Sequence, residues 1–135
     1  MIRAGALLLV LMLAGCAGLR PGACPAGQER LRTAQLFFGH KAPDQPRVPD
    51  RAFRKFVDEE LTTRFPDGLT VLDGGGQWKG EENRRIREAA KVVLIVLPKA
   101  APDADSRLAA VKAAYKTRFN QDSDLLVTPP ACVAF

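Results

Sequence analysis

The sequence predicts an α+β domain, in which short apolar runs typical of strands alternate with two longer segments of helical periodicity. A compact apolar run at residues 33–38 predicts a strand, and an apolar run without alternation at residues 92–97 predicts a strand that is buried on both faces. Apolar residues three and four positions apart recur within residues 50–64 and 103–121, which predicts two helices with one buried face each. With two further, weaker strands, the expected order along the chain is β-α-β-β-α-β.

A loop rich in proline separates the first strand from the first helix. The strand at residues 33–38 stops at Gly39, and residues 40–49 contain three prolines. Asp50 can then cap a helix that ends near Arg64. The apolar face of this helix consists of Phe53, Phe56, Val57 and Leu61.

The second and third strands are expected to pair as a hairpin. Residues 66–68 read Pro-Asp-Gly, a turn signal that leads into a strand at residues 69–72, and the glycines at residues 74–76 then loosen that strand. The polar residues 81–88 are predicted to form the hairpin tip and residues 89–97 the third strand. Because the third strand is the most apolar stretch after the N-terminal segment, we expect it in the middle of the sheet.

The last strand is interrupted by proline. It comprises residues 125–127 and 132–135, and the intervening Pro129-Pro130 is tolerable only at a sheet edge or a bulge. The order of elements is the split βαβ arrangement of ferredoxin-like sandwiches, a four-stranded antiparallel sheet with two helices on one face. In that arrangement the first and third strands are central, and the second and fourth, broken by glycine and proline, lie at the edges.

The N-terminus resembles the signal peptide of a bacterial lipoprotein. Arg3 precedes an unbroken apolar run over residues 4–14, which is too short to span about 30 Å of hydrocarbon. Residues 13–16 read Leu-Ala-Gly-Cys, like a lipobox, so residues 1–15 are expected to be cleaved and Cys16 to carry lipid. The alternative is an ordinary secretory peptide that is cut nearby, with Cys16 unmodified.

These features predict a protein that is tethered to a membrane of the cell envelope. Residues 16–32 are rich in Gly, Pro and Ala and predict a lipidated tether, and residues 33–135 are expected to form a single domain. Ala17, rather than an aspartate, follows Cys16, which resembles the sorting signal for the outer membrane. The expected location is the periplasmic face of that membrane.

The charge of the chain gives no indication of nucleic-acid binding. Loss of residues 1–15 removes one basic residue, so the net charge falls from +5 to +4. The sole basic cluster is Arg84-Arg85-Ile86-Arg87, which is read either as a solvated hairpin end or as a site attracted to anionic lipid headgroups. No nucleic-acid partner is expected for an exported protein of this kind.

Two cysteines remain when Cys16 is lipidated. Cys24 precedes the first strand and Cys132 lies in the last, and these two strands are antiparallel neighbours in the expected sheet. Export exposes both thiols to oxidation, so a disulfide between them is predicted. The alternative is two unpaired thiols, with Cys132 buried in the core.

The sequence lacks the motifs of common catalytic and cofactor sites. It contains no CxxC, HExxH, Walker-type loop or nucleophile elbow. The only histidine, His40, lies close to Asp44 on a loop with prolines, where two such residues are typical of a surface rather than of a metal site. We therefore expect no metal and no cofactor.

Several separated segments together resemble a known bacterial family. They are residues 36–39 (Leu-Phe-Phe-Gly), 64–71 (Arg-Phe-Pro-Asp-Gly-Leu-Thr-Val), 76–78 (Gly-Gln-Trp) and 115–121 (Tyr-Lys-Thr-Arg-Phe-Asn-Gln). Their order and spacing are similar to those of the family called domain of unknown function 3574, over residues 33–135. The resemblance implies a small exported or lipid-anchored envelope protein. It transfers no catalytic residue, because the family has no established activity.

The polar and aromatic residues of these segments, with Glu88, form a candidate binding patch. Each also has a structural interpretation, such as completing a helix end or packing across the sheet. If Gln77 and Trp78 lie on an edge strand near the end of the second helix, they form a pocket for a small anionic or planar ligand. The patch consists of Arg64, Gln77, Trp78, Glu88, Arg118 and Gln121.

Two classes of function are compatible with the sequence. The first is a noncatalytic envelope module that binds a protein, a glycan or a small ligand. The second is a small cofactor-independent enzyme built on a ferredoxin-like sheet. In that enzyme Glu88 or His40 would act as general base and Arg118 would stabilise a developing anion.

Overall fold

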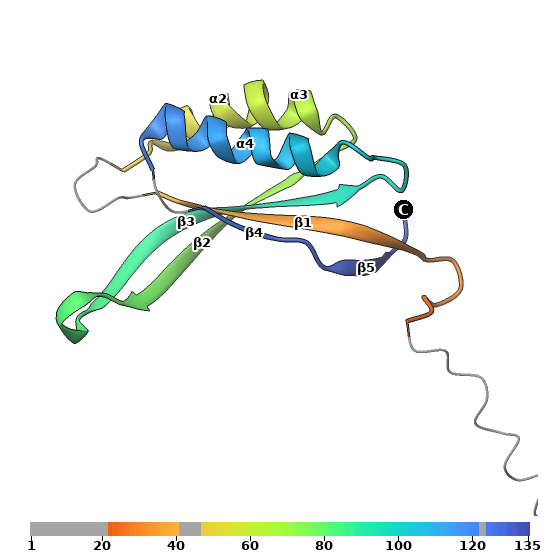
Figure 1. Ribbon diagram of the computed structural model, residues 1–135, viewed down its shortest axis with the longest axis horizontal. Helices are drawn as coiled ribbons and strands as arrows, with labels where there is room; N and C mark the ends of the chain where they lie inside the picture. Colours follow the sequence, from red (N-terminus) through yellow and green to blue (C-terminus); the bar gives the residue numbers. More distant parts are fainter. Residues whose placement is uncertain (1–21, 41–46, 122–123) are drawn as a thin grey trace, which may run out of the picture. The chain divides into compact units, whose positions relative to one another are not determined.

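The computed structural model describes residues 22–40, 47–121 and 124–135 (Figure 1). The chain divides into two compact units. The larger, Leu31–Ala131, holds the helices and most of the sheet. Of the smaller unit the structure describes residues 22–30 and 132–135.

An antiparallel sheet forms the base of the larger unit. Its main path runs in the order β2-β3-β1-β4, so β1 and β3 are central and β2 and β4 lie at the two ends, while a fifth strand pairs with β1 off this path. The strands are β1 (Glu29–Gly39), β2 (Thr70–Lys79), β3 (Arg85–Leu97), β4 (Asp124–Val127) and β5 (Pro130–Val133).

Two helical segments cover one face of the sheet (Figure 1). The first is a continuous run of three parts, α2 (Asp50–Phe56), a π-helical turn η2 (Val57–Leu61) and α3 (Thr62–Arg64). The second is α4 (Ala104–Phe119), which ends at Asn120 in the left-handed conformation. Their positions agree with the two helical segments expected from apolar spacing.

The core lies between the helices and the sheet. Alternate residues of β1 and β3 point into it, among them Leu36 and Val93, which are direct neighbours in the sheet. Five aromatic rings continue the core between the helices, with centroids 4.5–6.3 Å apart in their contacting pairs. These rings belong to Phe38, Phe53, Phe56, Tyr115 and Phe119.

The hairpin of β2 and β3 is much longer than the sequence predicts. Strand β2 passes through all three glycines to Lys79, and β3 begins at Arg85, so the expected tip at residues 81–88 is wrong. The tip is a short 3-10 turn, η3 (Glu81–Asn83). The prediction fails because this part of the hairpin covers no core and therefore has no apolar periodicity.

The outer part of this hairpin is a two-stranded arm. Pairing of β3 with β1 ends at Ala90, whereas pairing of β3 with β2 continues to the pair Lys79 and Arg85. The surface of the arm is open: a Cβ added at Gly76 would meet no atom within 4 Å. Figure 1 shows the arm reaching beyond the ends of both helices.

The first and last strands also differ from their predicted limits. Strand β1 begins at Glu29, inside the segment that is expected to be tether. The predicted last strand is divided into β4 and β5, and Pro129 lies between them, with its carbonyl oxygen accepting hydrogen bonds from the backbone and hydroxyl of Thr33, both at 2.9 Å. A proline between two short strands is consistent with its missing amide donor.

The smaller unit contains a disulfide. Cys24 and Cys132 are bonded, with their Cα atoms 5.5 Å apart and a sequence separation of 108 residues. The guanidinium of Arg30 donates a hydrogen bond to the carbonyl of Gly22 at 3.0 Å in the same unit. The cysteine pair expected from the strand order thus lies at disulfide distance.

Among the described residues, no helix is long and apolar enough to cross a membrane.

Candidate binding face

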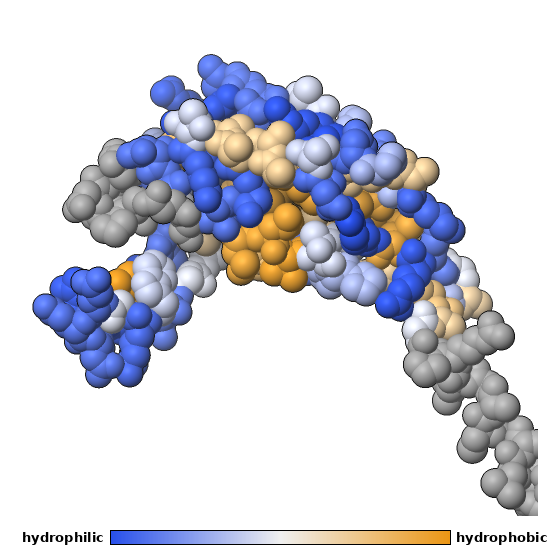
Figure 2. All heavy atoms as spheres, viewed as in Figure 1, coloured by the Kyte–Doolittle hydropathy of each residue, from blue (hydrophilic) through white to orange (hydrophobic). Residues whose placement is uncertain are grey.

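The face of the sheet away from the helices carries exposed apolar side chains. Strand alternation directs Phe37 and Val92, which are neighbours in the sheet, to this open face. Figure 2 shows an apolar patch below the helices and a hydrophilic surface over the end of the hairpin arm. The exposed large apolar residues that alternation places on the open face are Leu72, Trp78, Leu125 and Val127.

A hollow of about 370 Å³ lies on this face, next to the start of the hairpin arm. Three successive glycines, residues 74–76, form one side of it, and the rings of Phe37 and Trp78 stand at its border. Glycine keeps the hollow open, since a Cβ added at Gly74 would already stand 3.2 Å from the side chain of Val92. Leu125 and Ala90 add to its apolar lining.

The hollow brings together three of the six residues of the predicted patch. Trp78, which is 46% exposed, is directly opposite Ile86, and Glu88 is directly opposite Gly76. Gln77 contributes to the lining, but its side-chain oxygen accepts a hydrogen bond at 2.9 Å from Arg87, its neighbour in β3. Glu88 is the ionisable residue among those that line the hollow.

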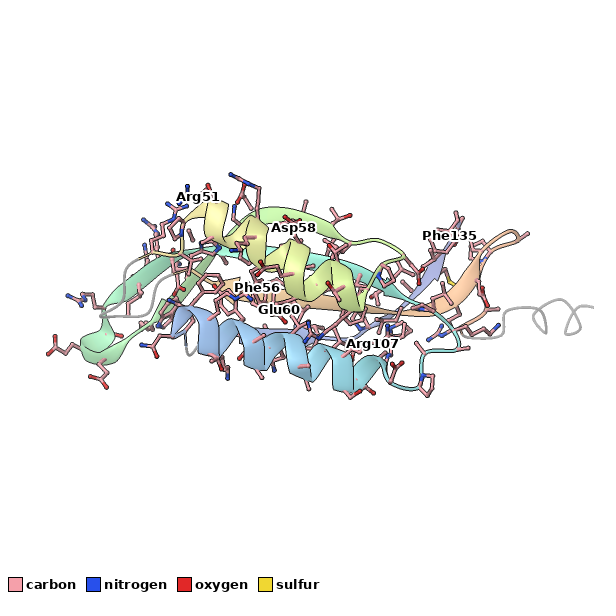
Figure 3. All side chains as sticks on the ribbon, turned by 90° about the horizontal axis from the view of Figure 1, so that it is seen from above. Arg51, Phe56, Asp58, Glu60, Arg107 and Phe135 are labelled. Atoms are coloured by element: carbon pink, nitrogen blue, oxygen red, sulfur yellow. A yellow bond between two sulfur atoms is a disulfide. The ribbon has the colours of Figure 1, made fainter. Side chains whose placement is uncertain are left out.

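Arg64 and Arg118 lie instead in the helical layer. Arg118 donates to Glu59 at 2.9 Å and to Glu60 at 3.0 Å, and its guanidinium stands 5.5 Å from the ring centroid of Phe56. Arg64 donates to the carboxylate of Glu60 at 2.7 Å. Figure 3 shows Glu60 and Phe56 on the side of the first helical segment that faces α4. Arg118 therefore ties α4 to the first helical segment, whereas Arg64 bonds within that segment. The predicted grouping of Arg118 with Trp78 is not found.

Gln121 is buried and has a structural contact. It is 2% exposed, and its amide donates a hydrogen bond to the carbonyl of Phe119 at 3.3 Å. This bond satisfies an acceptor near the end of α4, where helical carbonyls lose their usual partners.

His40 is also buried, at 1% exposure. Its Nδ1 is 3.0 Å from the carbonyl of Val48, its ring contacts Phe53, and its Nε2 has no hydrogen-bond partner among the described residues. Burial is the main cause that lowers the pKa of His40 below 6.5. Cys16 and Asp44, the predicted lipid site and the second loop residue, lie outside the described residues. No group of three or more metal-binding side chains occurs in the described ranges.

An ion-pair group occupies the helix-facing side of the β2–β3 hairpin. Lys91 donates a hydrogen bond to Asp73, its sheet neighbour, and another to Asp50 at 2.9 Å. The bond to Asp73, followed by that to Asp50, raises the pKa of Lys91. Asp73 nonetheless remains 86% exposed, so one side of its carboxylate is accessible to solvent.

Phe37, Leu125 and the glycines of the hollow are not predicted as site residues from the sequence. A strand read only as an apolar run does not reveal which residues face the helices. The available signal is the alternation of side chains along a strand. Phe37 lies between the core positions Leu36 and Phe38, so its side chain must point to the opposite face of the sheet.

The fold and the hollow define a small α+β domain with one covered and one open sheet face. The chain belongs to the family described as "Protein of unknown function (DUF3574)", which matches residues 33–135. This confirms the family resemblance seen in the sequence. No curated protein sequence matches the chain.

Several solved structures are similar in fold. A phage SAM lyase in complex with S-methyl-5'-thioadenosine has a TM-score of 0.56 and 12% identity, covering 87% of this chain and 97% of that one. A phage SAM lyase in the apo state has a TM-score of 0.53 and 15% identity, with 78% and 92% coverage. CutA1 from Oryza sativa has a TM-score of 0.48 and 10% identity, with 78% and 84% coverage. At these identities the lyase structures support a shared fold and nothing more.

Proposed function

We propose that the protein is a binding module of the bacterial cell envelope, and that the hollow on the open sheet face is its binding site. The observation that carries this proposal is the joint placement of aromatic rings, glycines and Glu88 around one hollow. Small-molecule sites are typically concave and mostly apolar, with a few polar groups that fix orientation.

The lining of the hollow indicates the class of ligand. Phe37 and Trp78 offer flat apolar surfaces, and Glu88 contributes the carboxylate. A planar molecule with a positively charged or hydrogen-bond-donating group fits this combination. The anionic ligand considered from the sequence fits less well, because Arg118 is held by Glu59 and Glu60.

The enzyme alternative has less support from the geometry. It requires Glu88 or His40 to act as a base close to Arg118. Glu88 lines the hollow, His40 is buried against Val48 and Phe53, and Arg118 bonds to the acidic residues of the first helical segment. Arg118 therefore bonds to acidic residues of the helical layer and is not among the residues that line the hollow with Glu88.

The finer architecture that we propose is the ferredoxin-like βαββαβ sandwich, with β5 as an addition beside β1. The order β2-β3-β1-β4 and the antiparallel pairing of the three strand pairs along this path support it.

The ligand proposal is tested with proflavine, a planar aromatic cation, on the full-length protein in detergent. Trp78 is the only tryptophan of the chain, so its fluorescence reports directly on the hollow. We expect saturable quenching by proflavine, and a roughly tenfold weaker Kd for Glu88→Gln, equivalent to about 1.4 kcal/mol.

Two matched variants separate the hollow from other contributions. Glu82→Gln makes the same charge change at the exposed hairpin tip and should leave the Kd unchanged. Arg118→Ala should lower the melting temperature, because it removes the ion pairs with Glu59 and Glu60, but should also leave the Kd unchanged. Quenching that is not saturable, or equal weakening by Glu88→Gln and Glu82→Gln, would contradict the proposed site.

A further inference from the structure

Strand β2 is a long exposed edge of the sheet. All ten of its residues are exposed, and in the described sheet it pairs with β3 alone. Its outer side therefore presents a row of backbone groups that another strand can pair with. The strand at the other end of the path, β4, has only four residues.

The sequence of β2 is complementary to itself when two copies run antiparallel. Pairing about a two-fold axis through Gly76 places Asp73 of one copy opposite Lys79 of the other, twice in each dimer. Centring on Gly75 would place Lys79 opposite Val71, and centring on Gly74 would place Asp73 opposite Gly75. Opposite charges in direct cross-strand positions are stabilising, so Gly76 is the favoured centre.

The same register matches a large side chain with a glycine. Trp78 of one copy stands opposite Gly74 of the other, and both lie on the open face because directly opposite residues share a face. An aromatic residue beside a glycine across two strands covers the backbone that glycine exposes. The indole would thus reach the border of the neighbouring hollow, which Gly74 helps to line.

We propose that two copies of this chain pair through their β2 edges, antiparallel and centred on Gly76, so that each Trp78 completes the other copy's hollow. This inference rests on the proposed binding site and names the second copy as its partner. The interface is isologous, as expected for a two-fold dimer.

The test is disulfide crosslinking of the Gly76→Cys variant in the full-length, membrane-associated protein. At the two-fold centre the two introduced cysteines face each other, at the Cα separation of about 4.5–5.5 Å of antiparallel neighbours, which permits a disulfide. A Cβ at Gly76 meets no atom within 4 Å, so the variant should fold. After oxidation with copper phenanthroline, we expect most of the protein in a dimer band on a non-reducing gel.

Gly75→Cys is the matched control, since its Cβ contact, the Glu88 carbonyl at 3.7 Å, is an ordinary one and its position is off the axis. It should crosslink far less than Gly76→Cys. In the Gly76→Cys background, Lys79→Asp should reduce crosslinking, because it would place two acidic residues opposite each other at both ends of the paired region.

The crosslinking experiment tests the dimer, and the proflavine experiment tests the ligand site, so the two proposals can fail independently. Equal crosslinking of both cysteine variants, or none, would overturn the dimer, even if proflavine still bound in a manner dependent on Glu88. Crosslinking that follows the predicted pattern while proflavine fails to bind would support the dimer and overturn the ligand site.

Discussion

Among the described residues, several buried or half-buried polar side chains bond to backbone carbonyls. The hydroxyl of Tyr115 donates to the carbonyl of Gly39 at 2.6 Å, and burial raises the pKa of this tyrosine strongly. Arg107 donates to the carbonyl of Arg64 at 2.7 Å and stands over the ring of Phe65. Such contacts secure the ends of strands and helices, since unpaired polar groups are costly inside a protein.

His40 should make the stability of the protein depend on pH. Its pKa is lowered by burial, so in the unfolded chain the imidazole binds a proton near pH 6.5, while the folded state resists protonation to lower pH. Its contribution to stability is therefore complete above about pH 6.5 and is lost as the pH falls below that value. We expect the free energy of unfolding in urea to decrease from pH 7 to pH 5.

Because His40 is the only histidine, His40→Leu should remove this part of the pH dependence. The slope due to one proton cannot exceed about 1.4 kcal/mol per pH unit. An unchanged slope in the variant would assign the pH dependence to other groups.

Sequence reasoning locates single residues less well than it locates elements. Trp78 is predicted as a binding residue and does line the hollow, but Arg118 and Gln121 belong to helix ends. Their types alone cannot separate these roles, because an arginine beside two glutamates in space is distant from them in sequence. Only the packing of α4 on the first helical segment brings Arg118 to Glu59 and Glu60.

At the scale of elements, apolar periodicity predicts the helices and strands that contribute to the core, and it misses the strands that do not. The helices and the central strands β1 and β3 bury one face or both, so their apolar spacing is visible in the sequence. The hairpin arm is exposed on both sides, and polar residues such as Arg85 and Arg87 carry no sign of a strand. The alignment of its two strands is instead indicated by directly opposite apolar side chains such as Trp78 and Ile86.

The disulfide should stabilise the fold measurably. It closes a loop of about 100 residues, for which the chain-entropy model gives up to about 4.7 kcal/mol, and measured contributions are typically about 2–4 kcal/mol. Replacing Cys24 and Cys132 together by serine should therefore lower the free energy of unfolding by about 2–4 kcal/mol. Urea denaturation of the oxidised protein and the double variant measures this difference.

Mass spectrometry of the unreduced, alkylated protein supplies the control. Alkylation of both Cys24 and Cys132 in the natural protein would show that the bond is absent in the cell.

At the scale of the whole molecule, we propose that a lipid on Cys16 holds the protein on the periplasmic face of the outer membrane. The apolar run and the small residues before Cys16 support this proposal. Cys16→Ser should release the exported protein from the membrane, because long acyl chains provide about 0.8 kcal/mol per buried methylene. Fractionation after a high-salt wash is the measurement.

The natural protein, fractionated in parallel, should remain with the membrane under the same wash. Retention of the exported Cys16→Ser form would place the attachment elsewhere in the chain.

The bond between Cys24 and Cys132 has a consequence for resistance to proteases at the envelope location that we propose. Nearly the whole domain lies within the covalent ring that this bond closes. A single proteolytic cut in any loop between the two cysteines opens the ring but leaves both pieces joined through sulfur. The C-terminal piece would thus stay attached to Cys24, and through it to the lipid that we propose on Cys16. A nicked molecule would be retained at the membrane rather than shed, and only a reductant would separate its halves.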